Sequence, residues 1–467
     1  MKQKTYPQMP LPAGEAWRAL IALCIGFFMI LLDQTIVAVA TPAFQHDLEA
    51  SYSQVVWVTS VYLLFFAVPL LVTGRLGDRY GPKNVYIAGM TLFTVMSLAC
   101  GLSSSIEMLI ISRALQGLGA ALLTPQTMSV INRIFPREKR GAALGIWGAT
   151  AGLSTMSGPV AGGVITTLWS WQWIFFVNIP IGIISVITVA AWVPRFKPLP
   201  RPIDGQSMIL SMLAMFAFVF AILQGESAHW AWWIWVMLAA GAIITYLFLR
   251  RQKHLSGSGN EPLLPLELFN HRDFSYGNIG IVAMGFTSAG MNLPIMIFLQ
   301  EVHGMSALAS GMVMVPTSII STVLAPFVGR LVDRIDPRPV ATIGFLTMAT
   351  AIALLVVVMR PGVGLAWIFV PMVVMGLGHS GVWTPNSTMT LRDLPARQAG
   401  AGSGAYNTMR QLGAVTGSAV IGAVMQSRVV ATNGSASAFG EALIPAVIVL
   451  VIGAVAAWQA RHGRAKL

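Results

Sequence analysis

The stretch Leu31-Leu32-Asp33-Gln34-Thr35-Ile36-Val37 places a single carboxylate inside an apolar run that extends from Trp17 to Val39. With a rise of ~1.5 Å per residue, this run is long enough to cross the ~30 Å hydrocarbon core of a bilayer, and Asp33 then lies ~9 Å inside one face. A charge at that depth is costly, so such acids face a partner or a cavity and mark an ion, proton or substrate path. The alternative is that Asp33 only joins neighbouring helices through hydrogen bonds. Asp33 is therefore the first candidate functional residue.

The composition extends the membrane prediction to the whole chain. Of 467 residues, 55% are hydrophobic and 10% are charged, and the mean hydropathy is +0.72, which excludes a soluble enzyme and predicts an all-α polytopic membrane protein. The two cysteines, Cys24 and Cys100, fall inside apolar spans, so we expect neither a disulfide framework nor a metal site. The net charge of +12 comes from short basic loops, which indicates membrane topology and no nucleic-acid partner.

Hydropathy along the chain predicts fourteen membrane spans. They cover residues 17–39, 52–73, 84–103, 107–134, 141–168, 173–193, 206–223, 230–250, 275–299, 307–329, 339–359, 364–391, 398–426 and 440–460. Of the 29 Lys and Arg residues, Arg360 and Arg428 fall in the loops opposite the termini, and Arg113 and Arg410 fall inside spans, which leaves 25 on the terminus side. The positive-inside rule therefore predicts cytoplasmic termini in a multi-pass protein of the cell (inner or plasma) membrane.

Two sequence patterns occur twice, in the same order. The segment Gly74–Lys83 recurs 255 positions later as Gly329–Arg338, and the pattern from Gly117 to Ala142 recurs from Gly376 to Ala401. Repeats that keep their orientation indicate two parallel six-helix halves. Spans 206–223 and 230–250 have no counterpart, so we interpret them as an inserted hairpin.

These repeats predict three parts of the chain. An N-terminal six-helix bundle covers residues 1–193, and a C-terminal six-helix bundle covers residues 275–467. The linker, residues 194–274, carries the two inserted helices and the segment 262–269, which is too short and polar to span a bilayer and is expected at the interface.

Five motifs lie along the chain. They are Leu32–Pro42, Gly74–Lys83, Arg113–Ala121, a glycine pattern in the fifth span and Trp171–Pro180 at the start of the sixth. The set resembles the fourteen-helix drug:proton antiporters of the major facilitator superfamily, of the multidrug efflux type. The resemblance implies the major facilitator fold, with two extra central helices. Ala38, Pro82, Ser154 and Gln172 depart from the residues usual in that family.

The glycine pattern of the fifth span resembles the antiporter motif, which most symporters of the superfamily lack. Its residues here are Gly145, Ser154, Gly158, Pro159, Gly162 and Gly163. Pro159 removes a helical hydrogen bond and bends the helix, while the glycines allow close helix contact. This packing argument is sufficient for the residues themselves, and the link to antiport rests on the resemblance.

The repeated loop motif predicts a conformational latch on the cytoplasmic side. We define the latch as Gly74, Asp78, Arg79, Gly81, Asp333 and Arg334. Asp78 is expected to accept hydrogen bonds from the backbone at a neighbouring helix start, and Arg79 to bind a carboxylate or carbonyl. The alternative is a basic loop that only sets topology.

Arg113 is the expected partner of Asp33. It lies ~9 Å below the outer edge of an antiparallel span, which is the depth of Asp33, and an unpaired intramembrane arginine is hard to sustain. Arg410 has no obvious acidic partner, so a carbonyl partner and a cavity-facing role stay open.

The second half offers fewer polar candidates. Ser288 stands at the counterpart of Asp33, and Asn292 follows it. His379 is a candidate for proton coupling together with Asp33 and Arg113, although a lone histidine in an apolar helix is more often a hydrogen-bonded core residue. The candidate substrate cavity comprises Asp33, Trp57, Gln116, Trp147, Met291 and Asn292, in which Met and Trp side chains give adaptable walls.

These observations, with the resemblance, predict a proton-coupled antiporter and not an enzyme. It would export hydrophobic, often cationic, drugs or toxic compounds from the cytoplasm by alternating access, as a monomer without a cofactor. The alternative is export of an endogenous metabolite, lipid or peptide by the same machinery. No phosphate-binding Gly-Lys-Ser/Thr loop or catalytic nucleophile with a base is present in the sequence, which disfavours an ATP-driven pump and a membrane enzyme. A transporter-like receptor stays open.

Overall fold

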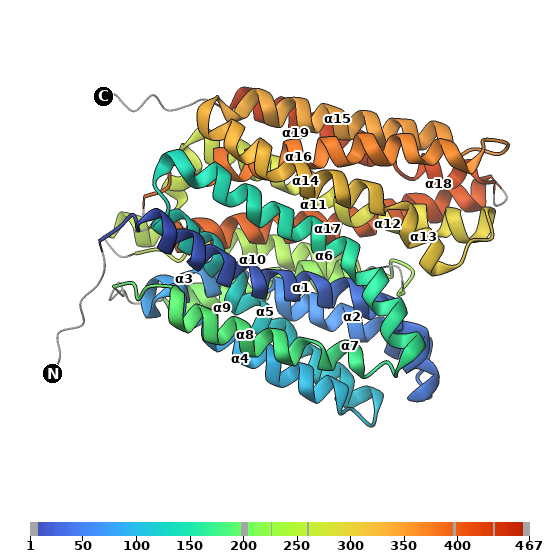
Figure 1. Cartoon of the computed structure of the whole chain (residues 1–467), viewed down its shortest axis with the longest axis horizontal. Helices are drawn as coiled ribbons and strands as arrows, with labels where there is room; N and C mark the ends of the chain where they lie inside the picture. Colours follow the sequence, from blue (N-terminus) through green and yellow to red (C-terminus); the bar gives the residue numbers. More distant parts are fainter. Residues whose placement is uncertain are drawn as a thin grey trace.

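The computed structural model describes residues 8–197, 204–225, 227–258, 261–395, 398–432 and 435–460, and every regular element within these ranges is a helix (Figure 1). Up to residue 192 the helices are α1 (Ala13–Asp47), α2 (Tyr52–Ala67), α3 (Leu70–Tyr80), α4 (Pro82–Gly101), α5 (Ile106–Ile134), α6 (Arg140–Leu168), α7 (Trp173–Phe176) and α8 (Asn178–Trp192). The inserted and later helices are α9 (Gly205–Gly225), α10 (Trp232–Gly257), α11 (Arg272–Gly290), α12 (Asn292–Ile297), α13 (Ala307–Val313), α14 (Val315–Arg334), α15 (Pro337–Val358), α16 (Phe369–Leu391), α17 (Ala399–Ala431), α18 (Ser437–Glu441) and α19 (Ile444–Gln459). The prediction of an all-α polytopic membrane protein is confirmed.

The number of membrane-crossing helices is close to the predicted fourteen. Among the described residues, 12 helices are long and apolar enough to cross a membrane, and the bent pair α2–α3 adds a thirteenth. The remaining predicted span, 141–168, coincides with α6, a 29-residue helix that stands outside this count. Fourteen crossings therefore stay a prediction.

A proline explains why the second span is broken. The helix axis turns by 47° between α2 and α3, and Pro69 is the N-cap residue of α3. Proline lacks the N–H that would continue the α2 ladder, so the chain bends there. After the bend, α3 packs on α17 of the second half of the chain. α3 carries the loop motif.

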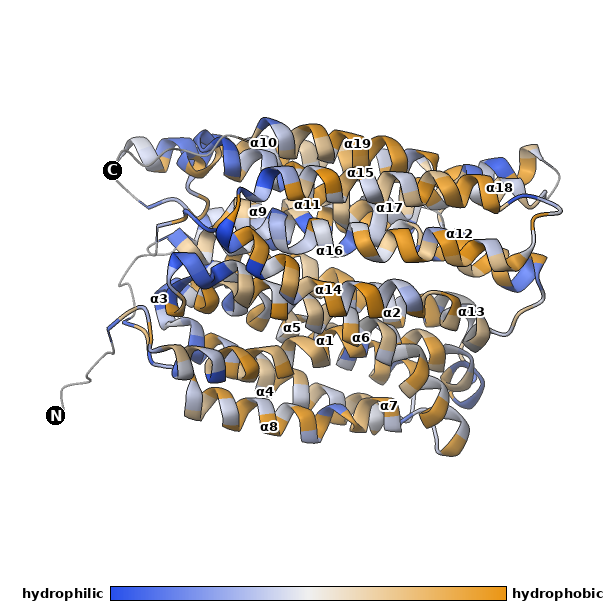
Figure 2. Ribbon diagram, turned by 45° about the horizontal axis from the view of Figure 1, so that its top comes forward, coloured by the Kyte–Doolittle hydropathy of each residue, from blue (hydrophilic) through white to orange (hydrophobic). Residues whose placement is uncertain are grey.

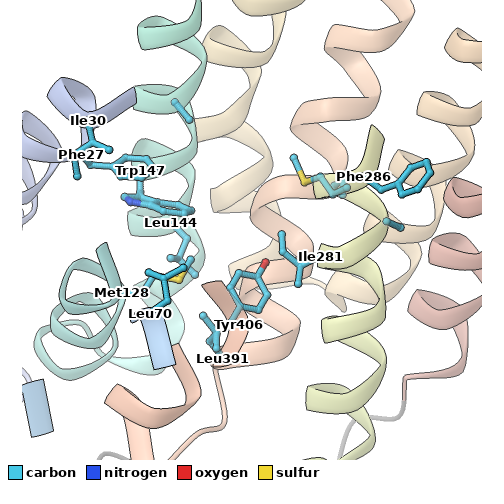
Figure 3. Packing of buried hydrophobic residues seen from close by; sticks show 14 of the residues in the cluster. Phe27, Ile30, Leu70, Met128, Leu144, Trp147, Ile281, Phe286, Leu391 and Tyr406 are labelled. Carbon is cyan, nitrogen blue, oxygen red and sulfur yellow. The ribbon is translucent and has the colours of Figure 1, made fainter. Parts of the chain in front are cut away.

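The helices pack in two groups with contacts between them. α1 packs on α6 and α8, and α4 packs on α5, while α11 packs on α17 and α19, and α15 packs on α16. Across the groups, α6 packs on α14 and α3 packs on α17. Figure 3 shows buried hydrophobic side chains of both groups, among them Phe27 and Trp147 of the first group and Ile281 and Tyr406 of the second.

The inserted hairpin α9–α10 packs against both groups. Arg251 of α10 donates two hydrogen bonds to Asp204, at 2.6 and 2.7 Å, and these tie the base of the hairpin. They lower the pKa of the Asp204 carboxyl, because the guanidinium stabilises its ionised form. α9 shares a buried apolar cluster with α2 and α17, formed by Leu64, Ala67, Val68, Met215, Val219 and Val415.

Two ends of the molecule can be distinguished. α1 begins and α19 ends at the same end, which we call the terminus side, and α7, α13 and α18 lie at the opposite end, the far side (Figure 1). Hydrophilic residues gather at these ends, and hydrophobic residues dominate the middle of the helices (Figure 2). Seven basic residues assigned to the terminus side lie outside the described residues, namely Lys2, Lys4, Arg201, Arg397, Arg461, Arg464 and Lys466.

Candidate functional site

Asp33 sits at the centre of a buried hydrogen-bond network between α1, α5 and α8. Its Oδ2 accepts from Arg113 Nη1 at 2.6 Å, and its Oδ1 accepts from Gln116 Nε2 and Asn178 Nδ2, both at 3.0 Å. The Asp33 side chain has 0% exposure and that of Arg113 has 1%. The ion pair expected from the equal depth of the two residues is therefore present, and it is sealed from solvent in this conformation.

The Arg113 guanidinium has further partners. Its Nη1 also donates to Gln116 Oε1 at 2.6 Å, and its Nε donates to the Val58 carbonyl at 3.4 Å. The guanidinium carbon lies 4.1 Å from the centre of the Tyr62 ring. This set holds the cation in one orientation, which compensates for the loss of water around a buried charge.

Ser97 and Asn178 complete the network, and the sequence did not identify their role. Ser97 Oγ accepts from Gln116 Nε2 at 2.6 Å and from Asn178 Nδ2 at 3.3 Å. Asn178 lies in the Trp171–Pro180 motif, which was the available signal, whereas a serine in an apolar helix carries none because it can bond to its own backbone. Gln116, proposed for the cavity, is fully buried and serves here as a bridge between Arg113 and Asp33.

The other candidate cavity residues are dispersed. Trp147 is buried and stacks on Phe27 at 4.5 Å between ring centroids. Met291 is buried at the end of α11, and Asn292, the first residue of α12, is exposed and donates to the Ser288 carbonyl of α11 at 3.0 Å. These residues do not share the Asp33 network.

Trp57, the last member of the candidate cavity, and His379, the third candidate for proton coupling, also lie apart from the Asp33 network. Trp57 packs on Phe220 of α9, with 5.9 Å between ring centroids, so it faces the inserted hairpin in this conformation. His379 stacks on Trp383 within α16, with 6.0 Å between ring centroids and 18° between the ring planes. No hydrogen bond joins His379 to another described residue, and none of its contacts reaches Asp33.

The first half of the latch joins α3 to α5 and α17. Asp78 Oδ1 accepts from Arg133 Nη2 at 2.6 Å and from the Gly400 backbone N–H, at the start of α17, at 3.2 Å. The backbone contact is the one expected for Asp78. α3 and α17 approach so closely that a Cβ on Gly74 would lie 2.5 Å from the Gly400 carbonyl oxygen, so only glycine fits there.

The second half of the latch repeats this arrangement across the groups. Asp333 at the end of α14 accepts from the backbone N–H groups of Gly141 and Ala142, at the start of α6, at 2.7 and 2.8 Å. A carboxylate at a helix N-terminus is stabilised by the unpaired N–H groups and the helix dipole. Unlike the two aspartates, Arg79 and Arg334 do not join the two groups of helices in this conformation. Arg79 lies 5.3 Å from the Tyr80 ring, Arg334 is exposed, and among the described residues neither makes an ion pair.

Additional polar contacts close the terminus side. Arg137 forms an ion pair with Asp393, and Arg140 donates to the Arg392 carbonyl, so the start of α6 is tied to the end of α16. Gly81, at φ +86°, makes the turn between α3 and α4. The two groups are thus held together by charged and backbone contacts at this end.

The glycine pattern of α6 mediates packing on two sides. A Cβ on Gly158 would lie 2.0 Å from Thr35 Oγ1 on α1, and one on Gly145 would lie 2.6 Å from the Ala325 carbonyl on α14. A Cβ on Gly162 would meet Val39 at 3.0 Å, and Gly163 accepts from Thr167 Oγ1 at 2.6 Å. Ser154 Oγ donates to the Phe28 carbonyl of α1 at 3.2 Å. α6 continues as a helix through residue 159, and the side chain of Pro159 lies outside the described residues.

No group of three or more His, Cys, Asp or Glu side chains could hold a metal within the described ranges.

A sequence model of the Major Facilitator Superfamily matches residues 23–418. The chain belongs to the major facilitator superfamily. It is therefore a membrane-embedded transporter of small molecules.

The chain is similar to two relatives in sequence and to one solved structure in fold. An uncharacterized MFS-type transporter of Mycobacterium tuberculosis is 46% identical over 415 residues, which cover 89% of this chain and 71% of the relative. The tetracenomycin C resistance and export protein of Streptomyces glaucescens is 33% identical over 420 residues, with 89% and 77% covered. The crystal structure of a human organic anion transporter aligns with a TM-score of 0.67 at 12% identity, over 94% of this chain and 100% of that one, and this likeness concerns the fold alone.

Proposed function

We propose that this major facilitator protein exports hydrophobic small molecules, among them cations, in exchange for protons. The observation that carries the proposal is the sealed Asp33–Arg113 pair with its neutral donors Gln116 and Asn178. A carboxylate held this way inside a membrane is a candidate proton carrier, because its charge is tolerated only while its partners stay in place. The export direction is supported by the relative from Streptomyces glaucescens, which is named as a resistance and export protein.

Coupling at this site requires proton and substrate to exclude each other. Protonation of Asp33 removes its attraction for Arg113 and for a cationic substrate, and deprotonation restores both. Each ligand then weakens the binding of the other by the same factor, as linkage demands. His379 is the alternative proton carrier, but its partner is the Trp383 ring and not an acid.

The latch supplies the conformational half of the cycle. We assign the terminus side to the cytoplasm, because the basic residues of the loops concentrate there. Asp78 and Asp333 each bind the backbone at the start of a helix in the other group, so these contacts form when the cytoplasmic side is closed and are lost when it opens. Rocking of residues 1–193 against 275–467 then exposes the cavity alternately, with α9–α10 as an inserted hairpin.

We assign the chain to the fourteen-helix drug:proton antiporters and place it as a monomer in the cell membrane.

The test of the proposed function uses purified protein in liposomes loaded with a fluorescent hydrophobic cation such as ethidium. Imposing a pH gradient in the direction that drives antiport should move ethidium against its own gradient, and collapsing the gradient with an ionophore should stop it. Ethidium movement that ignores the pH gradient would contradict proton-coupled antiport.

A further inference from the structure

Arg410 carries a positive charge inside α17, and no acid in the described part of the chain forms an ion pair with it. Within the described ranges its guanidinium makes no ion pair or hydrogen bond, and its buried Nε has no acceptor. The sequences of α6, α16 and α17 contain no Asp or Glu. An arginine in this setting is costly, so it is a functional-site candidate by default.

A stack of aromatic rings leads from α1 to this guanidinium. The ring centroids are 4.5 Å apart for Phe27 and Trp147, 5.3 Å for Trp147 and Trp383, and 6.0 Å for Trp383 and His379. The Arg410 guanidinium carbon lies 5.9 Å from the centre of the Trp383 ring. The stack therefore crosses from α1 and α6 to α16 and ends beside α17.

This region has donors without acceptors. The indole N–H groups of Trp147 and Trp383 and the hydroxyl of Thr384 have no hydrogen-bond partner among the described residues, and Trp147 is 1% exposed. Trp383, His379 and Arg410 keep part of their surface accessible. Buried donors of this kind are costly to leave unpaired, so the missing component is an acceptor.

We propose that Arg410, Trp383 and Trp147 form a subsite for a planar aromatic substrate that carries an anionic group, a carboxylate or an ionised phenol. The guanidinium and the indole N–H groups bind the anion, and the partly exposed rings of Trp383 and His379 contact the aromatic part of the substrate. Asp33 is enclosed by three donors, so in this conformation the charge that remains available to a substrate is positive. This inference rests on the proposed function and adds anionic aromatic compounds to the hydrophobic substrates proposed there.

The test measures the binding of two matched probes, anthracene-9-carboxylate and anthracene-9-methanol, to the purified full-length protein. Quenching of tryptophan emission reports the binding of each probe. The native protein should bind the carboxylate more tightly than the alcohol. Arg410→Gln should weaken carboxylate binding about ten- to hundredfold, as expected for a lost charge-assisted hydrogen bond, and leave alcohol binding unchanged. Arg410→Lys should restore part of the preference.

The matched control is Arg428→Gln in the same helix, which removes an exposed ion pair with Glu441 and should change neither affinity. Circular dichroism and size-exclusion profiles confirm that each variant is folded. A native protein that shows no preference for the carboxylate, or an Arg410→Gln variant that loses both probes equally, would overturn the subsite. Proton-driven ethidium export can fail while the carboxylate preference persists, so the two proposals fail separately.

Discussion

At the scale of single residues, the decisive feature is that Asp33 and Arg113 satisfy each other inside the bilayer. Gln116 bonds both members of the pair, and Asn178 adds a donor to the carboxylate. A buried pair of this kind contributes little net stability, but removing one partner alone leaves an uncompensated buried charge, which costs ~3–5 kcal/mol. The network is therefore stable only when Asp33 and Arg113 are both charged and paired, or when neither leaves an unpaired charge buried.

This argument predicts the behaviour of Arg113 variants. Arg113→Met should lower the melting temperature of the detergent-solubilised protein by several degrees, consistent with a loss of ~3–5 kcal/mol. The double variant Asp33→Asn with Arg113→Met should recover much of that loss, because no charge stays buried. Melting is followed at one fixed scan rate.

The control for this series is Arg428→Gln. Arg428 lies 3.4 Å from Glu441 with a 50% exposed side chain, so its loss should cost less than ~1 kcal/mol. If the double variant melts as low as Arg113→Met alone, the pair is not the source of the penalty.

The sequence could predict the pair but not its surroundings. Asp33 and Arg113 stand out because charges are costly in an apolar span and their depths agree. Ser97 and Asn178 are neutral, and a neutral polar side chain in a helix can bond to its own backbone, so its partner is set by packing alone. That Arg410 has no carbonyl partner among the residues that the structure describes is likewise visible only once the helices are packed.

At the scale of elements, sequence patterns set helix positions better than helix orientations. The spans follow from hydropathy and the backbone acceptor role of Asp78 follows from the motif, whereas the predicted span 52–73 did not include the break at Pro69. Trp57 was expected in the cavity and instead packs on Phe220 of the inserted hairpin. A helix that is apolar all round does not show in its sequence which face meets which neighbour.

The latch gives a prediction at this scale. Asp78→Asn removes the charge that Arg133 and the Gly400 N–H bind, so it should shift the protein toward the state open on the terminus side. Turnover should fall about tenfold, while substrate affinity changes less than about twofold, because Asp78 is bonded to helix ends and not to the candidate cavity. Initial transport rates and equilibrium binding measure the two quantities.

Asp204→Asn is the matched control for the latch. Asp204 is also an acid on the terminus side, but it pairs with Arg251 inside the hairpin, so its loss should leave the equilibrium between facing states unchanged. An Asp78→Asn variant that loses binding but opens and closes normally would contradict the latch.

At the scale of the whole molecule, the arrangement of basic loops predicts which side faces the cytoplasm. In a variant without Cys24 and Cys100, a cysteine at Ser256 should react with an impermeant maleimide only from inside the cell. A cysteine in the loop before α16 should react only from outside. Gly364 suits this second position better than Gly362, because Gly362 has φ +82°, which cysteine rarely adopts, whereas Gly364 has open space for a Cβ. Labelling of both sites from one side would refute the fourteen-span arrangement.

The central claim is that Asp33 is the site where a proton is exchanged for substrate, and substrate-induced proton release tests it most directly. In weakly buffered detergent solution with a pH indicator dye, adding ethidium to the native protein should release protons. Asp33→Asn should release none and should not move ethidium against its gradient in liposomes, although it stays folded. If Asp33→Asn releases as many protons as the native protein and still transports ethidium uphill, Asp33 is not the coupling residue, and His379 becomes the next candidate.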